Sequence, residues 1–247
     1  ESVRRLSQFE AQGLAMTAWS FAKLLLLDEP LMESISSHSQ ARVHQFGPQN
    51  VSNTLWSFAR FEFVDEPLCA AIACAALGLI SEFDSQELAN TSWAMAKLLV
   101  VHTPLISAIA AAVVSKIAQF SSQSQSNTAW AFAKLGILNE PMMTAIAGKA
   151  VRRIGECSPQ DLSSTVWAVA ALAWRHVPLI EALAVSFILG ISECSTQEIA
   201  NMSWAFATLG FLHEPLQNAI SIRAVSTIYE FEWQSLSNTA WSYAELS

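Results

Sequence analysis

The chain has 247 residues, of which 52% are hydrophobic and only 14% are charged, and its formal net charge at pH 7 is −8. This composition supplies ample apolar surface for a buried core and excludes an intrinsically disordered chain. The acidic balance also excludes a uniformly basic domain of the kind that usually binds polyanions.

The sequence is periodic, with one interval throughout. Tryptophan recurs every 37 residues, and six prolines keep the same interval: Trp19, Trp56, Trp93, Trp130, Trp167, Trp204 and Trp241; Pro30, Pro67, Pro104, Pro141, Pro178 and Pro215. A fixed period of this length is typical of repeat proteins. Their binding surfaces are built from equivalent positions in successive repeats, so we look for rows of residues and not for a single catalytic pocket.

Each repeat opens with the signals of a first helix. Asp84 and Glu87 have the spacing of a capping box, in which the side chains of the N-cap and third helical residues bond each other's backbone N–H groups. Ser158 with Asp161, and Ser195 with Glu198, repeat that spacing. In two copies the helix ends near a glycine, Gly136 or Gly210, which can adopt the left-handed conformation of a C-terminal cap.

A second helix begins at the Asp28-Glu29-Pro30 signal, which recurs at Asp65, Asn139 and His213. His102 and His176 also occupy this position, so we expect these histidines to cap helices. Two helices of about 14–16 residues joined by short turns predict an all-α protein. The expected fold is an α-solenoid of tandem 37-residue helix-turn-helix repeats that coil into a right-handed superhelix.

The expected organisation is a single α-solenoid over residues 1–247. Residues 1–9 would end a preceding repeat, and residues 232–247 would form the first helix of a further one. The six complete repeats cover residues 10–46, 47–83, 84–120, 121–157, 158–194 and 195–231. Because both ends lie inside a repeat, we expect the chain to be part of a longer protein, with any targeting segment outside it.

Two different stripes run along each first helix. Leu88, Met95 and their equivalents lie on one side at helical spacing and should face the second helix. The glutamine, asparagine, tryptophan and lysine at 86, 90, 93 and 97 are spaced by 4, 3 and 4 residues, so they line the opposite face. The tryptophans suit packing between neighbouring first helices. The asparagines suit either hydrogen bonds to the adjacent repeat or binding of a ligand.

Three rows on this face are candidates for RNA contact. The basic row is Lys23, Arg60, Lys97 and Lys134, which are either phosphate contacts or a solvated face; the asparagine row is Asn53, Asn90, Asn127 and Asn201; a variable row near the helix start includes Asn50, Glu87 and Ser124. A variable polar position on a regular scaffold suits the reading of one base per repeat. Helix capping accounts for the acidic members of the variable row equally well.

Other classes of function find little support. The sequence contains no uninterrupted apolar run of 18 or more residues, so we expect no membrane insertion. Cys69, Cys74, Cys157 and Cys194 lack the clustered spacing of a metal site and are expected to be small buried hydrophobes, without a metal or cofactor. No phosphate-binding loop or catalytic motif is present, so we expect no enzyme.

The segment of residues 85–98 and the pattern Gln-x-x-x-Asn-x-x-Trp-Ala-x-Ala-Lys resemble the octotricopeptide and heptatricopeptide repeat proteins, and the period is closer to the heptatricopeptide type. The likeness covers essentially the whole chain. It implies a protein of mitochondria or plastids that binds single-stranded RNA in transcript processing, translation or ribosome assembly. RNA binding is therefore the leading hypothesis, and a protein–protein scaffold within a larger organellar complex is the alternative.

Overall fold

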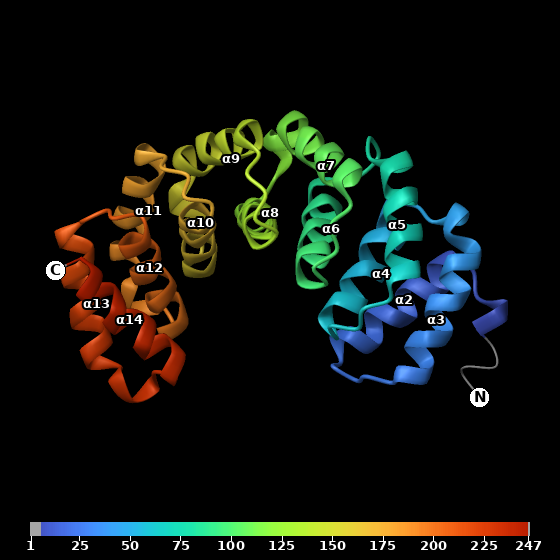
Figure 1. Cartoon of the computed structure of the whole chain (residues 1–247), viewed down its shortest axis with the longest axis horizontal. Coiled ribbons are helices and arrows are strands. Elements are labelled where there is room, and N and C mark those ends of the chain that lie inside the picture. The colour runs from blue at the N-terminus through green and yellow to red at the C-terminus, as the bar shows by residue number, and fades with distance from the viewer. Residues whose placement is uncertain (1–5, 247) are drawn as a thin grey trace. The chain divides into compact units, whose positions relative to one another are not determined.

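The computed structural model describes residues 6–246, which form thirteen α-helices and six short 3-10 helices and include no strand. The prediction of an all-α repeat fold is confirmed. The chain divides into two compact units, residues 1–119 and 120–247. Each unit is an α-solenoid segment built from paired helices (Figure 1).

The helix boundaries follow the 37-residue interval. The first helices all have 13 residues: α2 (Ala11–Lys23), α4 (Pro48–Arg60), α6 (Ser85–Lys97), α8 (Ser122–Lys134), α10 (Pro159–Ala171), α12 (Thr196–Thr208) and α14 (Trp233–Glu245). The second helices have 13 or 14 residues: α3 (Glu29–Arg42), α5 (Glu66–Leu79), α7 (Thr103–Lys116), α9 (Glu140–Arg152), α11 (Val177–Leu189) and α13 (Glu214–Ser226). The expected length of 14–16 residues holds for α3, α5 and α7, while the other helices are one residue shorter. The first helices from α2 to α12 are short because a left-handed residue follows two positions after the last helical residue.

Short 3-10 turns lie next to most second helices: η1 (Leu6–Gln8), η2 (Val43–Gln45), η3 (Ile117–Gln119), η4 (Ile154–Glu156), η5 (Ile191–Glu193) and η6 (Ile228–Glu230). From η2 onward these turns lead towards the next first helix. Each of these turns reverses the chain direction within the few residues between a second helix and the first helix of the next repeat.

Side-chain caps start the helices as expected. All three capping boxes are present, at Asp84 with Glu87, Ser158 with Asp161, and Ser195 with Glu198. The second helices from α3 to α13 are capped by Asp28, Asp65, His102, Asn139, His176 and His213, each of which accepts the N–H three residues ahead. In the three histidines the acceptor is Nδ1, which therefore carries no proton in this bond. The capping role of the histidines is confirmed.

A left-handed residue ends each of the first helices from α2 to α12. Gly136 and Gly210 have φ values of +68° and +57°, which confirms the glycine caps. The same position in the other four repeats holds residues with a side chain: Leu25, Glu62, Leu99 and Ala173, at φ values of 50–56°. These four repeats therefore hold side chains in a conformation that favours glycine.

Each unit has two helix layers (Figure 1). In residues 1–119, α4 packs between α2 and α6, while α5 packs between α3 and α7. In residues 120–247, α8, α10, α12 and α14 form one layer and α9, α11 and α13 form the other. Leu88 and Met95 are buried between the layers, as the pattern predicted. The right-handed superhelix and the repeat boundaries stay predictions.

The four cysteines are free thiols with unequal burial. Cys69 and Cys194 are buried and Cys157 is half-buried. The expectation of burial was wrong for Cys74, which is exposed on α5. It lies on the outer side of the second-helix layer, where Ala111 and Val185 occupy the equivalent positions and are also exposed.

No helix within residues 6–246 combines the length and the apolar character that a membrane span requires. The same residues contain no group of three or more histidine, cysteine, aspartate or glutamate side chains placed to hold a metal ion.

Candidate nucleic-acid interface

The polar stripe lies on the open side of the first-helix layer. The glutamine of every repeat is exposed: Gln12, Gln49, Gln86, Gln123, Gln160, Gln197 and Gln234. The tryptophans from Trp19 to Trp204 are half-buried. The apolar side of the same helices is covered by the second helices, so the side that the pattern assigned to binding is the accessible one.

The tryptophans stack on one another within each unit. The ring centroids of Trp56 and Trp93 lie 6.3 Å apart, with an interplanar angle of 32°. In the second unit Trp167 lies 6.2 Å from both Trp130 and Trp204. Neighbouring first helices start in the same register, so equal positions meet side by side and the offset rings stabilise each other. The result is an aromatic row along the face in each unit.

The basic row borders these indoles. The Lys23 ammonium lies 5.6 Å from the centroid of the Trp19 ring, within the range of a cation–π contact. Arg60 and Lys134 are exposed at the last residues of α4 and α8. Lys97 differs, because its Nζ bonds Glu62 Oε1 at 2.7 Å.

A hollow in the first unit combines cations with aromatic rings. It holds about 340 Å³ and is lined by Ala22, Lys23, Trp56, Arg60 and Trp93. These residues come from the C-terminal halves of α2, α4 and α6. A positive charge beside half-buried indoles suits a phosphate with its adjoining base or sugar.

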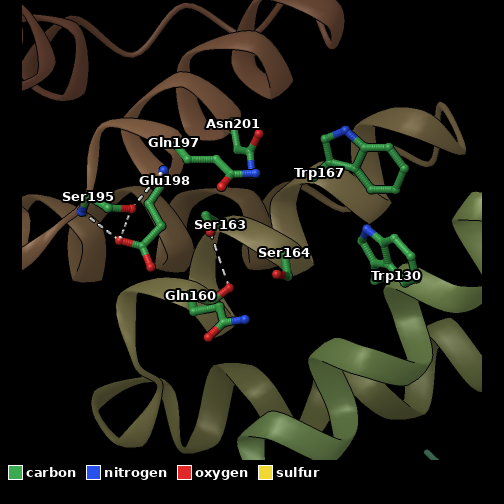
Figure 2. A pocket seen from close by; sticks show the side chains of 9 residues that line it. All are labelled: Trp130, Gln160, Ser163, Ser164, Trp167, Ser195, Gln197, Glu198 and Asn201. Carbon is green, nitrogen blue, oxygen red and sulfur yellow. Dashed lines mark hydrogen bonds between the residues drawn. The ribbon is translucent and has the colours of Figure 1, made fainter. Parts of the chain in front are cut away.

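A second hollow, in residues 120–247, has a different chemistry (Figure 2). It holds about 320 Å³ among α8, α10 and α12 and is lined by Trp130, Gln160, Ser163, Ser164, Trp167, Ser195, Gln197, Glu198 and Asn201. Trp130 and Trp167 lie at one side, Ser195 and Glu198 at the other, and the amide side chains lie between them. No lysine or arginine lines this hollow.

The asparagine row is half-buried at Asn53, Asn90, Asn127 and Asn201. The Asn53 amide nitrogen lies 4.0 Å from the sulfur of Met16, which holds the same position one repeat earlier. The other three side chains form no hydrogen bond with any residue of the 6–246 range. The amides therefore form no ladder between repeats there, and their donors and acceptors remain available to a ligand.

The variable row is engaged in the fold at two of its three candidate residues. Glu87 closes the capping box with Asp84, and burial raises the pKa of its carboxyl group. Ser124 is 8% exposed, and its hydroxyl accepts a hydrogen bond from Ser121. Asn50, by contrast, is half-buried at the surface of α4.

Sequence reasoning did not assign the glutamine row or Ser164 to the binding site. The glutamines carried a signal, since they recur in all seven copies on the stripe with the asparagines. Ser164 stands where the neighbouring repeats carry Asn127 and Asn201, and the repeat pattern by itself gives it no role. Its role in opening a hollow depends on the neighbouring helices.

These features define a helical-repeat protein with a polar and aromatic face on the first helices of each unit. The chain belongs to the family described as the RNA-editing substrate-binding complex 6 protein, which it matches over residues 2–103 and 106–247. A search of curated proteins finds no significant match.

Proposed function

We propose that the chain binds single-stranded RNA along the first-helix face, as a component of an RNA-editing substrate-binding complex. The observation that carries this proposal is the coincidence, on the accessible first-helix face of a single unit, of stacked tryptophans, exposed cations and asparagine amides without partners. RNA-binding surfaces combine such groups: cations contact phosphates, aromatic rings contact bases, and amides bond base edges. The family description supports the same conclusion.

The acidic net charge is compatible with RNA binding because of where the acids lie. Glu87, Asp161 and Glu198 close capping boxes at the starts of first helices. Lys23 and Arg60 lie at the opposite end of the first helices, beside the indoles. Local positive potential can therefore attract phosphate on an acidic protein, with modest affinity for unspecific polyanions.

The test is binding of labelled single-stranded RNA over a salt series, with the native chain and a Lys23→Ala, Arg60→Ala double variant. Loss of two phosphate contacts should make the slope of log K against log salt less negative by about 1.4, since each contact contributes about 0.7. A matched control is Arg152→Ala with Arg153→Ala, which removes the same charge from the end of α9. Equal affinities of the two double variants would contradict the proposal, as would absence of binding by the native chain at low salt.

A protein–protein scaffold is the second candidate, because the loops between the two helices of a repeat expose a row of apolar side chains. Its members, at equal positions, are 42–61% exposed: Leu27, Val64 and Val101 in one unit, and Leu138 and Leu212 in the other. A row of this kind suits a partner protein. Replacing Leu27, Val64 and Val101 with serine should then prevent incorporation of the chain into the complex, while its affinity for RNA stays unchanged.

We infer further that the chain acts in an organelle and that its repeats carry out no catalysis. The repeat pattern supports both inferences, through its resemblance to octotricopeptide and heptatricopeptide proteins. Membership of one of these two repeat types is itself part of the proposal. Fluorescence microscopy of the tagged full-length protein tests the location.

A further inference from the structure

The hollow of the second unit exists where the asparagine row is interrupted. Asn127 and Asn201 hold the row positions on α8 and α12, while α10 between them carries Ser164. A serine side chain is shorter than asparagine by an amide group. The space that the amide would fill is part of the hollow beside Trp130 and Trp167.

The groups that line this hollow can form hydrogen bonds but carry no positive charge. The side-chain amides of Gln160, Gln197 and Asn201 bond no residue in the described range 6–246. Glu198 uses its Oε2 atom for the cap, where it accepts from the backbone N–H of Ser195 at 2.7 Å and from its hydroxyl at 2.8 Å. Its Oε1 atom is left to accept from a ligand.

This chemistry fits a nucleobase better than a phosphate. A carboxylate without a nearby cation repels phosphate oxygens. A base is flat and uncharged, has donors and acceptors on its edge, and stacks well beside indoles. About 320 Å³ is ample for one base.

We propose that this hollow binds a single base of the RNA and prefers a base whose edge offers an exocyclic amino group, such as adenine or cytosine, over uracil, which has none. The inference rests on the proposed RNA-binding function. The amides of Gln160, Gln197 and Asn201 can bond any base edge, because each has both donor and acceptor groups. Glu198 selects among the bases, because its carboxylate only accepts hydrogen bonds. An exocyclic amino group donates to it directly, whereas the single N3–H donor of uracil lies between the O2 and O4 atoms, which the carboxylate repels.

The test compares an oligouridine of about 12 nucleotides with the same oligonucleotide carrying one internal adenosine. The strand can shift along the face, so the single adenine reaches the hollow in any starting register. The native chain should bind the adenosine-containing strand about tenfold more tightly. Cytidine in the same place should give a similar preference.

Ser164→Asn is the first variant, because it supplies the amide that the neighbouring repeats already accommodate. It should fill the hollow and abolish the preference, while affinity for oligouridine and its salt dependence stay within about twofold. Thr208→Asn is the matched control: it makes a similar change at the exposed end of α12, away from the hollow, and should keep the preference. Glu198→Gln, which preserves a capping oxygen, should lose the preference by admitting uracil.

The possible results separate this inference from the broader proposal. If the native chain binds no RNA, the proposed function fails and the inference with it. If it binds RNA with equal affinity for both strands, or if Ser164→Asn keeps the preference, the base-binding hollow is wrong and RNA binding stands. Loss of preference in both Ser164→Asn and Glu198→Gln, but not in Thr208→Asn, supports it.

Discussion

The Nζ atom of Lys97 lies 2.7 Å from Oε1 of Glu62, the left-handed residue that follows the first helix of the preceding repeat. The hydrogen bond and the positive charge of Lys97 lower the pKa of the Glu62 carboxyl group. The pair therefore keeps both charges at neutral pH, and Glu62 competes with any phosphate for Lys97. The row of four cations is uneven, because one member already has a carboxylate partner.

Replacing Glu62 with glutamine should release Lys97 for RNA. We expect affinity for single-stranded RNA to rise about threefold at low salt, with a salt slope about 0.7 more negative, as one further phosphate contact would give. Glu33→Gln, on the second helix α3, is the control with the same change of charge. An equal gain from both variants would mean that net charge, and not Lys97, sets the affinity.

Gln125 is a polar residue in the apolar core. It is 5% exposed, and its Oε1 atom has no hydrogen-bond partner, while its Nε2 donates to the backbone oxygens of Phe120 and Ser121. Both oxygens also accept from other donors, the Lys149 ammonium and the Gln125 backbone N–H. The equivalent positions include Leu88, Leu162 and Ile199. Gln125→Leu should raise the free energy of unfolding by about 1–2 kcal/mol, because an unpaired buried carbonyl is removed and apolar contact is gained. Urea denaturation measures the change. Gln123→Leu, on the exposed face, should give no such gain, and a destabilised Gln125→Leu protein would show that the amide is needed.

Glycine should be more stable than alanine at the left-handed positions that follow α10 and α12. Ala173 and Gly210 are equivalent, with φ values of +50° and +57°. Ala173→Gly should stabilise the protein by about 0.5–1 kcal/mol and Gly210→Ala should destabilise it by about 1 kcal/mol, because a Cβ atom is strained there. Thermal unfolding followed by circular dichroism would show both. Equal shifts in the same direction would contradict this explanation.

The four thiols should differ in reactivity. Burial raises the pKa of Cys69 and of Cys157 to about 11 and that of Cys194 to about 12. Thiolates are the reactive form, so at pH 8 these groups are protonated and two of them are also inaccessible. Maleimide should therefore label Cys74 first, as peptide mass spectrometry can establish, and Cys74→Ser should remove the fast phase. Early labelling of Cys194 would indicate local opening of the second unit.

Much of the fold could be predicted because its signals are local. A capping box such as that of Asp84 and Glu87 involves residues three positions apart, and the left-handed turn at Gly136 depends on one glycine. The tryptophan interval extends these local signals into an array. The position of the polar and aromatic face also followed, because residues spaced by three and four positions share one side of a helix.

The details of the candidate site depend on contacts between residues in neighbouring repeats. Glu62 is exposed in a loop and becomes a partner of Lys97 only when α4 and α6 lie side by side. Ser164 looks like a weakened member of the asparagine row, yet its short side chain leaves a hollow against Trp130 and Glu198. Periodicity places equivalent residues next to each other, whereas charge pairing and empty volume depend on side-chain conformations and lengths across the helix interface.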